Sequence, residues 1–170
     1  DPNMYRLASL ATADLSNVLL LNCDALKNKN LLNPLVTEAV SARLAASPEK
    51  RLKLVANLPY HVATPIIANL LASDFPWTCM VVTIQYEMAQ RLNARPHSSD
   101  YGALSVFVQA QCRVSIVHKL GPTVFWPRPK VDSAIVRIDP DHEATSRIHD
   151  RAALQVFLRD VFQHRRKVLG

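Results

Sequence analysis

Apolar and polar residues follow each other along the chain in blocks that predict a mixed α/β fold. Apolar runs of strand length, bounded by polar or turn-forming residues, occur at 17–22, 51–57, 78–85, 113–120 and 133–139. Segments with apolar residues at helical spacing occur at 34–47, 65–73, 86–94, 101–112 and 150–169. Strands that alternate with helices favour an α/β domain with a mostly parallel sheet. The last two strands have no helix between them and are therefore predicted to pair antiparallel.

Proline positions predict where two of the helices begin. Pro34 suits the first position of its helix, because that position needs no backbone N–H donor. Thr64 and Pro65 are predicted to be the N-cap and the first residue of the next helix. The helix at 150–169 is amphipathic, and its basic residues lie near its C-terminal end, where the helix dipole favours them.

Composition restricts the class of protein. The chain has 170 residues, of which 49% are apolar, so it can bury a core and is not disordered. Its longest apolar run is about six residues, whereas a membrane helix needs about 20. Because the first residues also lack a signal-peptide pattern, we expect a cytoplasmic protein without a membrane partner. The three cysteines are odd in number and lack metal-ligand spacing, which predicts reduced thiols and no metal site.

The formal net charge of +6 is compatible with a polyanionic partner and also with a solvated basic surface. The placement of the charge favours a partner, because many basic residues lie in the second two-thirds of the chain: Arg91, Arg95, Lys119, Arg128, Lys130, Arg165, Arg166 and Lys167. The three glycines are isolated, at positions 102, 121 and 170. This chain therefore contains no glycine-rich phosphate or dinucleotide loop.

Two polar segments follow predicted strands, at the position where α/β sheets bind their ligands. Asp24 follows the first strand, and Asn57-Leu58-Pro59-Tyr60 follows the second. Taken singly, Asp24 favours a turn or helix cap, Asn57 fits a turn as well as a ligand contact, and Tyr60 fits a half-buried core position. Together they favour a binding site. The Asn amide oxygen and a nearby carbonyl can both accept from one exocyclic amine, and the Tyr ring can stack on its heterocycle.

The tetrapeptide NLPY at 57–60 resembles the (N/D)-(P/L)-P-(Y/F/W) signature of methyltransferases that act on amino groups. Its Asn-Leu-Pro-Tyr form is similar to that of the ribosomal RNA adenine N6,N6-dimethyltransferases. Other segments resemble the same family in the same order, namely NCDAL (22–26, with Cys23 where the family has Gly), 85–109, FWPRPKVDSAIV (125–136) and FQHRRKVL (162–169). The resemblance covers nearly the whole chain and is closest to the bacterial 16S rRNA dimethyladenosine transferase type.

This resemblance implies S-adenosylmethionine as the cofactor. Asp24 would accept a hydrogen bond from the amino group of its adenine, Ala25 would donate its backbone N–H to the same ring, and Asn57 would also contact the cofactor. Cys23 would place a side chain near that site.

The resemblance also implies how the target adenine is held. Asn57, together with a carbonyl oxygen of Leu58 or Pro59, would accept hydrogen bonds from the N6 amine. The lone pair of the N6 nitrogen is delocalised into the adenine ring and must be directed at the methyl group of the cofactor. Tyr60 and Phe125 would sandwich the flipped base. Transfer from a sulfonium needs positioning rather than a strong base, so His61 is expected to be a bystander. Further contacts to RNA are expected from Arg128, Lys130, Arg165, Arg166 and Lys167.

These resemblances predict a Rossmann-like class I methyltransferase sheet that is truncated at its N-terminus. We expect a partial methyltransferase domain at 1–140 and the start of a C-terminal helical RNA-binding domain at 141–170. The family's glycine-rich loop and two strands would precede residue 1, so the chain alone is expected to be inactive, with an incomplete cofactor pocket.

The predicted function is dimethylation of two adjacent adenines near the 3′ end of 16S rRNA in the small ribosomal subunit, by a monomeric enzyme. Two alternatives are a 23S rRNA adenine methyltransferase and a non-catalytic RNA-binding or ribosome-assembly factor of the same fold. Segments 125–134 and 165–169 favour the 16S type. The presence of Asn57, Tyr60 and Phe125 argues against a loss of catalysis.

Overall fold

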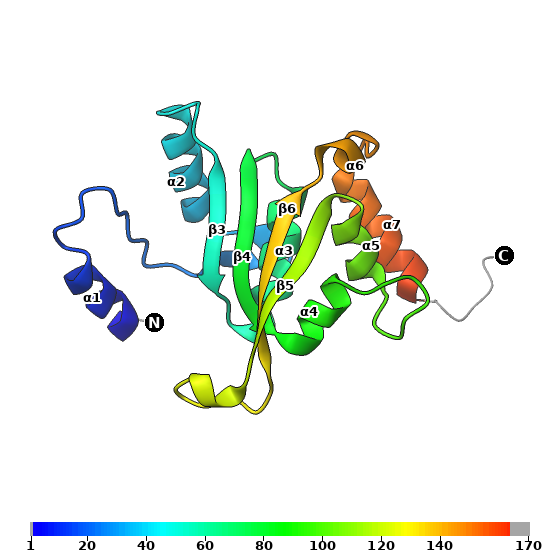
Figure 1. Cartoon of the computed structure of the whole chain (residues 1–170). Helices are drawn as coiled ribbons and strands as arrows, with labels where there is room; N and C mark the ends of the chain where they lie inside the picture. The colour runs from blue at the N-terminus through cyan, green and yellow to red at the C-terminus, as the bar shows by residue number, and fades with distance from the viewer. Residues whose placement is uncertain (1, 164–170) are drawn as a thin grey trace.

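A four-stranded sheet forms the centre of the molecule (Figure 1). The computed structural model describes residues 2–163. The strands, in their order across the sheet, are β3 (Leu52–Asn57), β4 (Trp77–Gln85), β6 (Ser133–Pro140) and β5 (Cys112–Leu120). β3 and β4 are parallel, whereas β6 is antiparallel to both β4 and β5. The predicted antiparallel pairing of the last two strands is confirmed. The expectation of a mostly parallel sheet is wrong for the described strands.

The helices surround this sheet unevenly. Figure 1 shows α3 behind the sheet, α4, α5 and α7 at the β5 side, and α1 standing apart from the strands. The helical elements are α1 (Pro2–Ala11), α2 (Pro34–Ala45), α3 (Tyr60–Ala72), α4 (Tyr86–Leu92), α5 (Ala103–Gln109), the 3₁₀ turn η1 (Pro122–Val124), α6 (His142–Ser146) and α7 (Arg151–Gln163). The predicted helices at 34–47, 86–94 and 101–112 are thus confirmed, with shorter ends. So is the described part of the terminal helix.

The core lies between one face of the sheet and the helices. Alternate residues of β4 (Met80, Val82 and Ile84) are fully buried, as period-two alternation requires. They belong to one hydrophobic cluster with Ile67 and Leu71 of α3. Burying side chains of this size stabilises a fold by about 1.5–3 kcal/mol each. This cluster therefore fixes α3, and the residues just before it, against the sheet.

The segment 17–22, predicted as a strand, is irregular, so this prediction is wrong. Leu19 is 54% exposed, and no described strand pairs with the segment. Backbone groups of an apolar run form a strand only when a neighbouring strand can take up their hydrogen bonds. Nearby, β1 (Leu26–Asn28) and β2 (Leu31–Leu32) form a small hairpin that is too short to be recognised from hydrophobic periodicity.

The predicted start of the helix at 65–73, which corresponds to α3, is also wrong. The helix begins at Tyr60, and Pro65 lies inside it. Thr64 is therefore no N-cap, and its hydroxyl lies 3.5 Å from Met88 Sδ. A proline within a helix removes one backbone hydrogen bond. The extra turn nevertheless forms, because it carries Ala63, which is fully buried in the core. The turn from β3 into α3 is consequently shorter than predicted.

Three cysteines are free thiols, and Cys112 is buried. Burial, aided by the nearby carboxylates of Asp141 and Asp139, raises the pKa of the Cys112 thiol to about 12. Among residues 2–163, no group of His, Cys, Asp and Glu is arranged to hold a metal ion. Nor is any helix in this range long and apolar enough to cross a membrane.

Candidate functional site

The predicted tetrapeptide lies at the carboxyl end of β3, next to the end of β4. Asn57 is the last residue of β3 and is in register with Thr83 of β4. The Leu58 N–H donates to the Thr83 carbonyl at 3.1 Å, which extends the ladder one residue beyond the strand. Leu58 is buried, whereas Asn57 and Pro59 are exposed. The buried leucine therefore anchors the turn while its neighbours face solvent.

Tyr60 connects this turn to a distant strand. It is the first residue of α3 and is half-buried. Its hydroxyl lies 2.7 Å from Oγ of Ser133, the first residue of β6, whose side chain is fully buried. Because an unpaired buried hydroxyl is costly, this contact favours one orientation of the Tyr60 ring.

The loop between β5 and β6 closes the other side of the site. A hollow of about 300 Å³ is lined by residues from both segments: Asn57, Leu58, Pro59, Tyr60, Phe125, Trp126, Pro127 and Pro129. The structure thus brings together all of the predicted catalytic residues, although Phe125 is far from the tetrapeptide in the sequence. A hollow of this size is at the lower end of the range for small-molecule sites.

The base of this loop is fixed by contacts of Lys119 and Tyr86 that sequence reasoning missed. Lys119 Nζ pairs with Asp132 Oδ2 at 2.8 Å and lies over the Tyr86 ring, 4.4 Å from its centroid. The Tyr86 N–H donates to the Asp132 carbonyl at 3.0 Å. The hydrogen bond that the Lys119 ammonium donates to the Asp132 carboxylate raises the pKa of Lys119. The end of β5, the residue before β6 and the start of α4 are therefore joined at the base of this loop.

Asp24 and Ala25 lie elsewhere, at the start of the β1–β2 hairpin, and neither lines the hollow. Asp24 Oδ1 accepts from the Leu26 N–H at 2.9 Å, which is the turn role that its residue type alone favours. The Ala25 carbonyl accepts from the Asn33 N–H at 2.9 Å.

These residues fit one end of S-adenosylmethionine. A carboxylate has about four acceptor positions, so the turn leaves Asp24 able to accept from an adenine amino group as well. The resemblance to the family implies a glycine-rich loop for another part of the cofactor, and the three isolated glycines of this chain do not form one. The fit of this chain to the cofactor is therefore partial.

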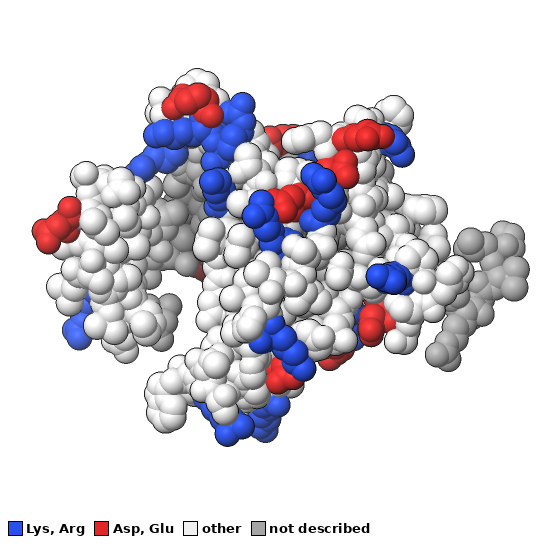
Figure 2. All heavy atoms as spheres, viewed as in Figure 1, with Lys and Arg blue, Asp and Glu red and all other residues white. Residues whose placement is uncertain are grey.

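Two of the predicted RNA-binding residues lie on the loop beside the hollow. Arg128 and Lys130 are both exposed. Figure 2 shows basic side chains at the foot of the molecule, where Figure 1 places the β5–β6 loop. Arg165, Arg166 and Lys167 lie outside the described residues.

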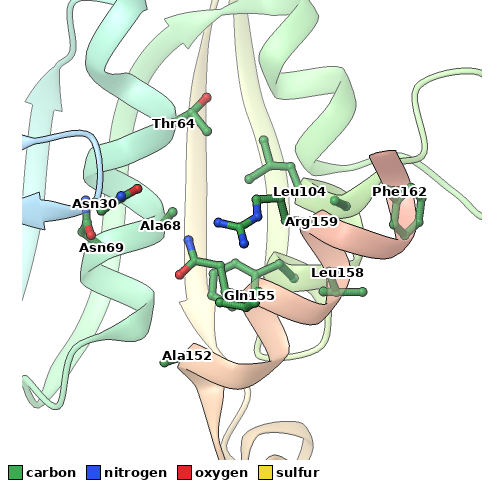
Figure 3. Close-up of a pocket in the computed structure, with 13 residues that line it drawn as sticks. Asn30, Thr64, Ala68, Asn69, Leu104, Ala152, Gln155, Leu158, Arg159 and Phe162 are labelled. Atoms are coloured by element: carbon green, nitrogen blue, oxygen red, sulfur yellow. The ribbon is translucent and has the colours of Figure 1, made fainter. Parts of the chain in front are cut away.

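A larger hollow of about 650 Å³ lies between α3, α5 and α7. Figure 3 shows Arg159 and Gln155 of α7 pointing into it, towards α3. Arg159 also donates to Asp160 Oδ1 at 3.0 Å. None of the described residues that we predicted for the site lines this hollow.

Comparison with known sequences identifies related proteins. A family model described as ribosomal RNA adenine dimethylase matches residues 1–170. The chain is 46% identical over 121 residues to ribosomal RNA small subunit methyltransferase A of Clostridium perfringens, which covers 71% of this chain and 42% of that protein. The protein of the same name from Halothermothrix orenii is also 46% identical, over 71% of this chain and 40% of that protein. The matched part is thus about two fifths of these relatives.

Solved structures show the same fold. A dimethyladenosine transferase from Plasmodium falciparum superposes with a TM-score of 0.77 at 26% identity, covering 99% of this chain and 55% of that one. The 23S rRNA methyltransferase ErmE superposes with a TM-score of 0.62 at 23% identity, covering 95% of this chain and 57% of that one. The expectation of a Rossmann-like α/β methyltransferase fold is confirmed.

Proposed function

The chain belongs to the ribosomal RNA adenine dimethylase family, and from this premise we propose that it binds and positions the adenine that accepts the methyl groups. The donor in this family is S-adenosylmethionine, and the product is N6,N6-dimethyladenine in ribosomal RNA. The observation that carries the proposal is the hollow in which Asn57, Tyr60 and Phe125 converge from separate elements.

Asn57 is proposed to hold the amine. Its side-chain oxygen and the carbonyl of Leu58 or Pro59 are two acceptors at one strand end, matching the two N–H groups of an adenine N6 amine. When these two oxygens accept hydrogen bonds from both N–H groups, they favour a pyramidal N6 nitrogen with its lone pair directed at the methyl group. Such positioning lowers the barrier without a general base, because the sulfonium is already a good leaving group.

Tyr60 and Phe125 are proposed to bind the faces of the flipped base. Both are half-buried and line the hollow from opposite segments. Stacking on an aromatic ring contributes about 1–3 kcal/mol per base. Asp24 and Ala25 are proposed to contact the adenine of the cofactor, and Asn57 is proposed to contact the cofactor as well.

The proposed substrate is 16S rRNA in the small ribosomal subunit, and the proposed place of action is the cytoplasm. The name of the bacterial relatives supports the small subunit. Exposed Arg128 and Lys130 beside the hollow are proposed to contact phosphates, as are Arg165, Arg166 and Lys167. The division into a methyltransferase part at 1–140 and the start of a helical domain at 141–170 also remains a proposal.

The decisive experiment replaces the proposed amine-binding residue. In the full gene product, Asn57→Ala should lower methyl transfer from tritiated S-adenosylmethionine to ribosomal RNA by about 10²-fold or more, because it removes an interaction needed in the transition state. Cofactor affinity should change little. Asn93→Ala is the matched control, since Asn93 is an exposed residue at the end of α4. Near wild-type turnover of Asn57→Ala would contradict the proposed role.

A further inference from the structure

We propose that Trp126 is a second base-binding residue, which stacks on a nucleotide flanking the target adenine. This inference rests on the proposed function, because it takes the hollow beside Trp126 to be the site of the target base. It adds a contact that extends the site along a single-stranded RNA.

The exposure of Trp126 is unusual for its residue type. Trp126 is 96% exposed and contributes to the lining of the hollow that Asn57 and Tyr60 also line. Large aromatic residues bury much apolar area in most folds, and the residue type is highly buried on average. A nearly free indole next to a proposed nucleobase site is available to stack on a further base, and base–aromatic stacking tolerates any sequence.

The local backbone separates Trp126 from its neighbour Phe125. Phe125 is in an extended conformation, with φ −116° and ψ 148°. Successive side chains of an extended segment project to opposite sides. In agreement, Phe125 is half-buried whereas Trp126 is exposed. Both residues contribute to the lining of the hollow, but the extended backbone at Phe125 directs successive side chains apart, so Trp126 is assigned to an adjacent nucleotide.

The surroundings of Trp126 favour RNA as its partner. Arg128 and Lys130 follow it on the same exposed loop and provide positive charge for a phosphate backbone. Pro127 and Pro129 restrict the backbone on that side of the indole. The ion pair between Lys119 and Asp132 fixes the loop at its base. Less conformational freedom is therefore lost when a base binds.

Intrinsic fluorescence can test this role directly. The chain has two tryptophans, so Trp77→Phe in the full gene product leaves Trp126 as the only one in this chain. The probe is a short single-stranded oligoadenosine RNA. The comparison RNA has the same length but lacks the bases that flank its central adenosine. The matched control is Val124→Ala, because Val124 is a 61% exposed apolar residue on the same loop.

We expect the intact RNA to quench Trp126 fluorescence saturably and the comparison RNA not to do so. Trp126→Ala should weaken binding of the intact RNA by roughly 5- to 150-fold, the equivalent of one lost stacking contact. It should leave binding of the comparison RNA unchanged. Trp126→Phe should restore most of the affinity, and Val124→Ala should bind as the wild type does.

Two results would overturn the inference: equal affinity of Trp126→Ala and wild type for the intact RNA, or equal quenching by both RNAs. A failure of the proposed function is detected separately, as a wild-type protein that transfers no methyl group to RNA. The fluorescence and affinity measurements need no methyl transfer, so they decide the role of Trp126 in either case.

Discussion

The contact between the Tyr60 hydroxyl and Ser133 Oγ connects the start of α3 to the start of β6. Ser133 is fully buried, so removing only its partner leaves a polar group unsatisfied, at a cost of about 1–3 kcal/mol. We expect Tyr60→Phe and Ser133→Ala each to lower the free energy of unfolding. The double variant should lose less than the sum of the two. Urea unfolding of all four proteins measures this coupling, and strictly additive losses would contradict it.

Two substitutions of Tyr60 distinguish the structural role of its hydroxyl from the proposed stacking of its ring on a base. Tyr60→Phe keeps the ring, so its affinity for RNA should stay within a few-fold of wild type. Tyr60→Ala should lose the stacking contribution of about 1–3 kcal/mol. If both variants bound RNA equally, Tyr60 would be a packing residue and not a base-binding one.

At this scale the sequence was informative where residue type and neighbours together specify chemistry. Asn57 and Tyr60 could be predicted because an acceptor and an aromatic ring follow a strand end closely. Phe125 came only from resemblance to a family. Ser133 and Lys119 were not predicted as parts of the site. The role of Ser133 depends on β6 lying beside β4, which the sequence pattern does not specify. The contact of Lys119 depends on where its side chain points once β5 and β6 pair.

At the scale of elements, the β5–β6 loop depends on the contact between Lys119 and Asp132. Both side chains are partly exposed, so the pair contributes little to global stability. We expect Lys119→Met to leave the melting temperature nearly unchanged while reducing methyl transfer several-fold, because the loop that carries Phe125 loses its fixed position. Asp132→Asn should have a similar effect.

The control for this prediction is Arg137→Met. Arg137 forms an exposed ion pair with Asp139 on β6, at 2.8 Å, and neither residue lines the hollow. Methyl transfer should be unaffected by this change. Equal losses from Arg137→Met and Lys119→Met would indicate a general charge effect and not a role in holding the loop.

Helices and strands were predicted correctly where the hydrophobic pattern of the segment is sufficient. The predictions failed where the structure of a segment depends on contacts with another part of the fold. Strand β4 forms where the apolar run at 78–85 predicts a strand. The run at 17–22 looks like a strand, but no described strand pairs with it. The start of α3 was misplaced because Pro65 looked like a first-turn residue. Burial of Ala63 before it stabilises the additional turn.

At the scale of the whole molecule, the proposed target site and the proposed cofactor contacts lie on different elements of the fold. The target site lies at the ends of β3 and β4, which the hydrophobic core holds in place. Asp24 lies on a small hairpin that is attached to α3 by a hydrogen bond from Asn69 Nδ2 to the Lys29 carbonyl at 3.3 Å. This separation was not predicted, because the sequence analysis placed Asp24 at the end of a strand at 17–22, and none of the described strands forms there.

This separation leads to a prediction for residues 1–170 as an isolated polypeptide. Asp24 and Ala25 can contact only the adenine end of S-adenosylmethionine, and they do not share a hollow with Asn57. The three glycines are isolated, so this chain contains no glycine-rich loop to contact the remainder of the cofactor. We therefore expect calorimetric titration with S-adenosylmethionine to show no binding in the micromolar range.

The matched measurement is titration of the same polypeptide with the short oligoadenosine RNA, which should still bind through Tyr60, Phe125 and the basic loop. Binding of RNA without binding of the cofactor would show that the polypeptide is folded and that the target site forms independently. Micromolar binding of S-adenosylmethionine would instead show that residues 1–170 contain a complete cofactor pocket. In that case the proposed placement of the cofactor, with only part of it in contact with this chain, would be wrong.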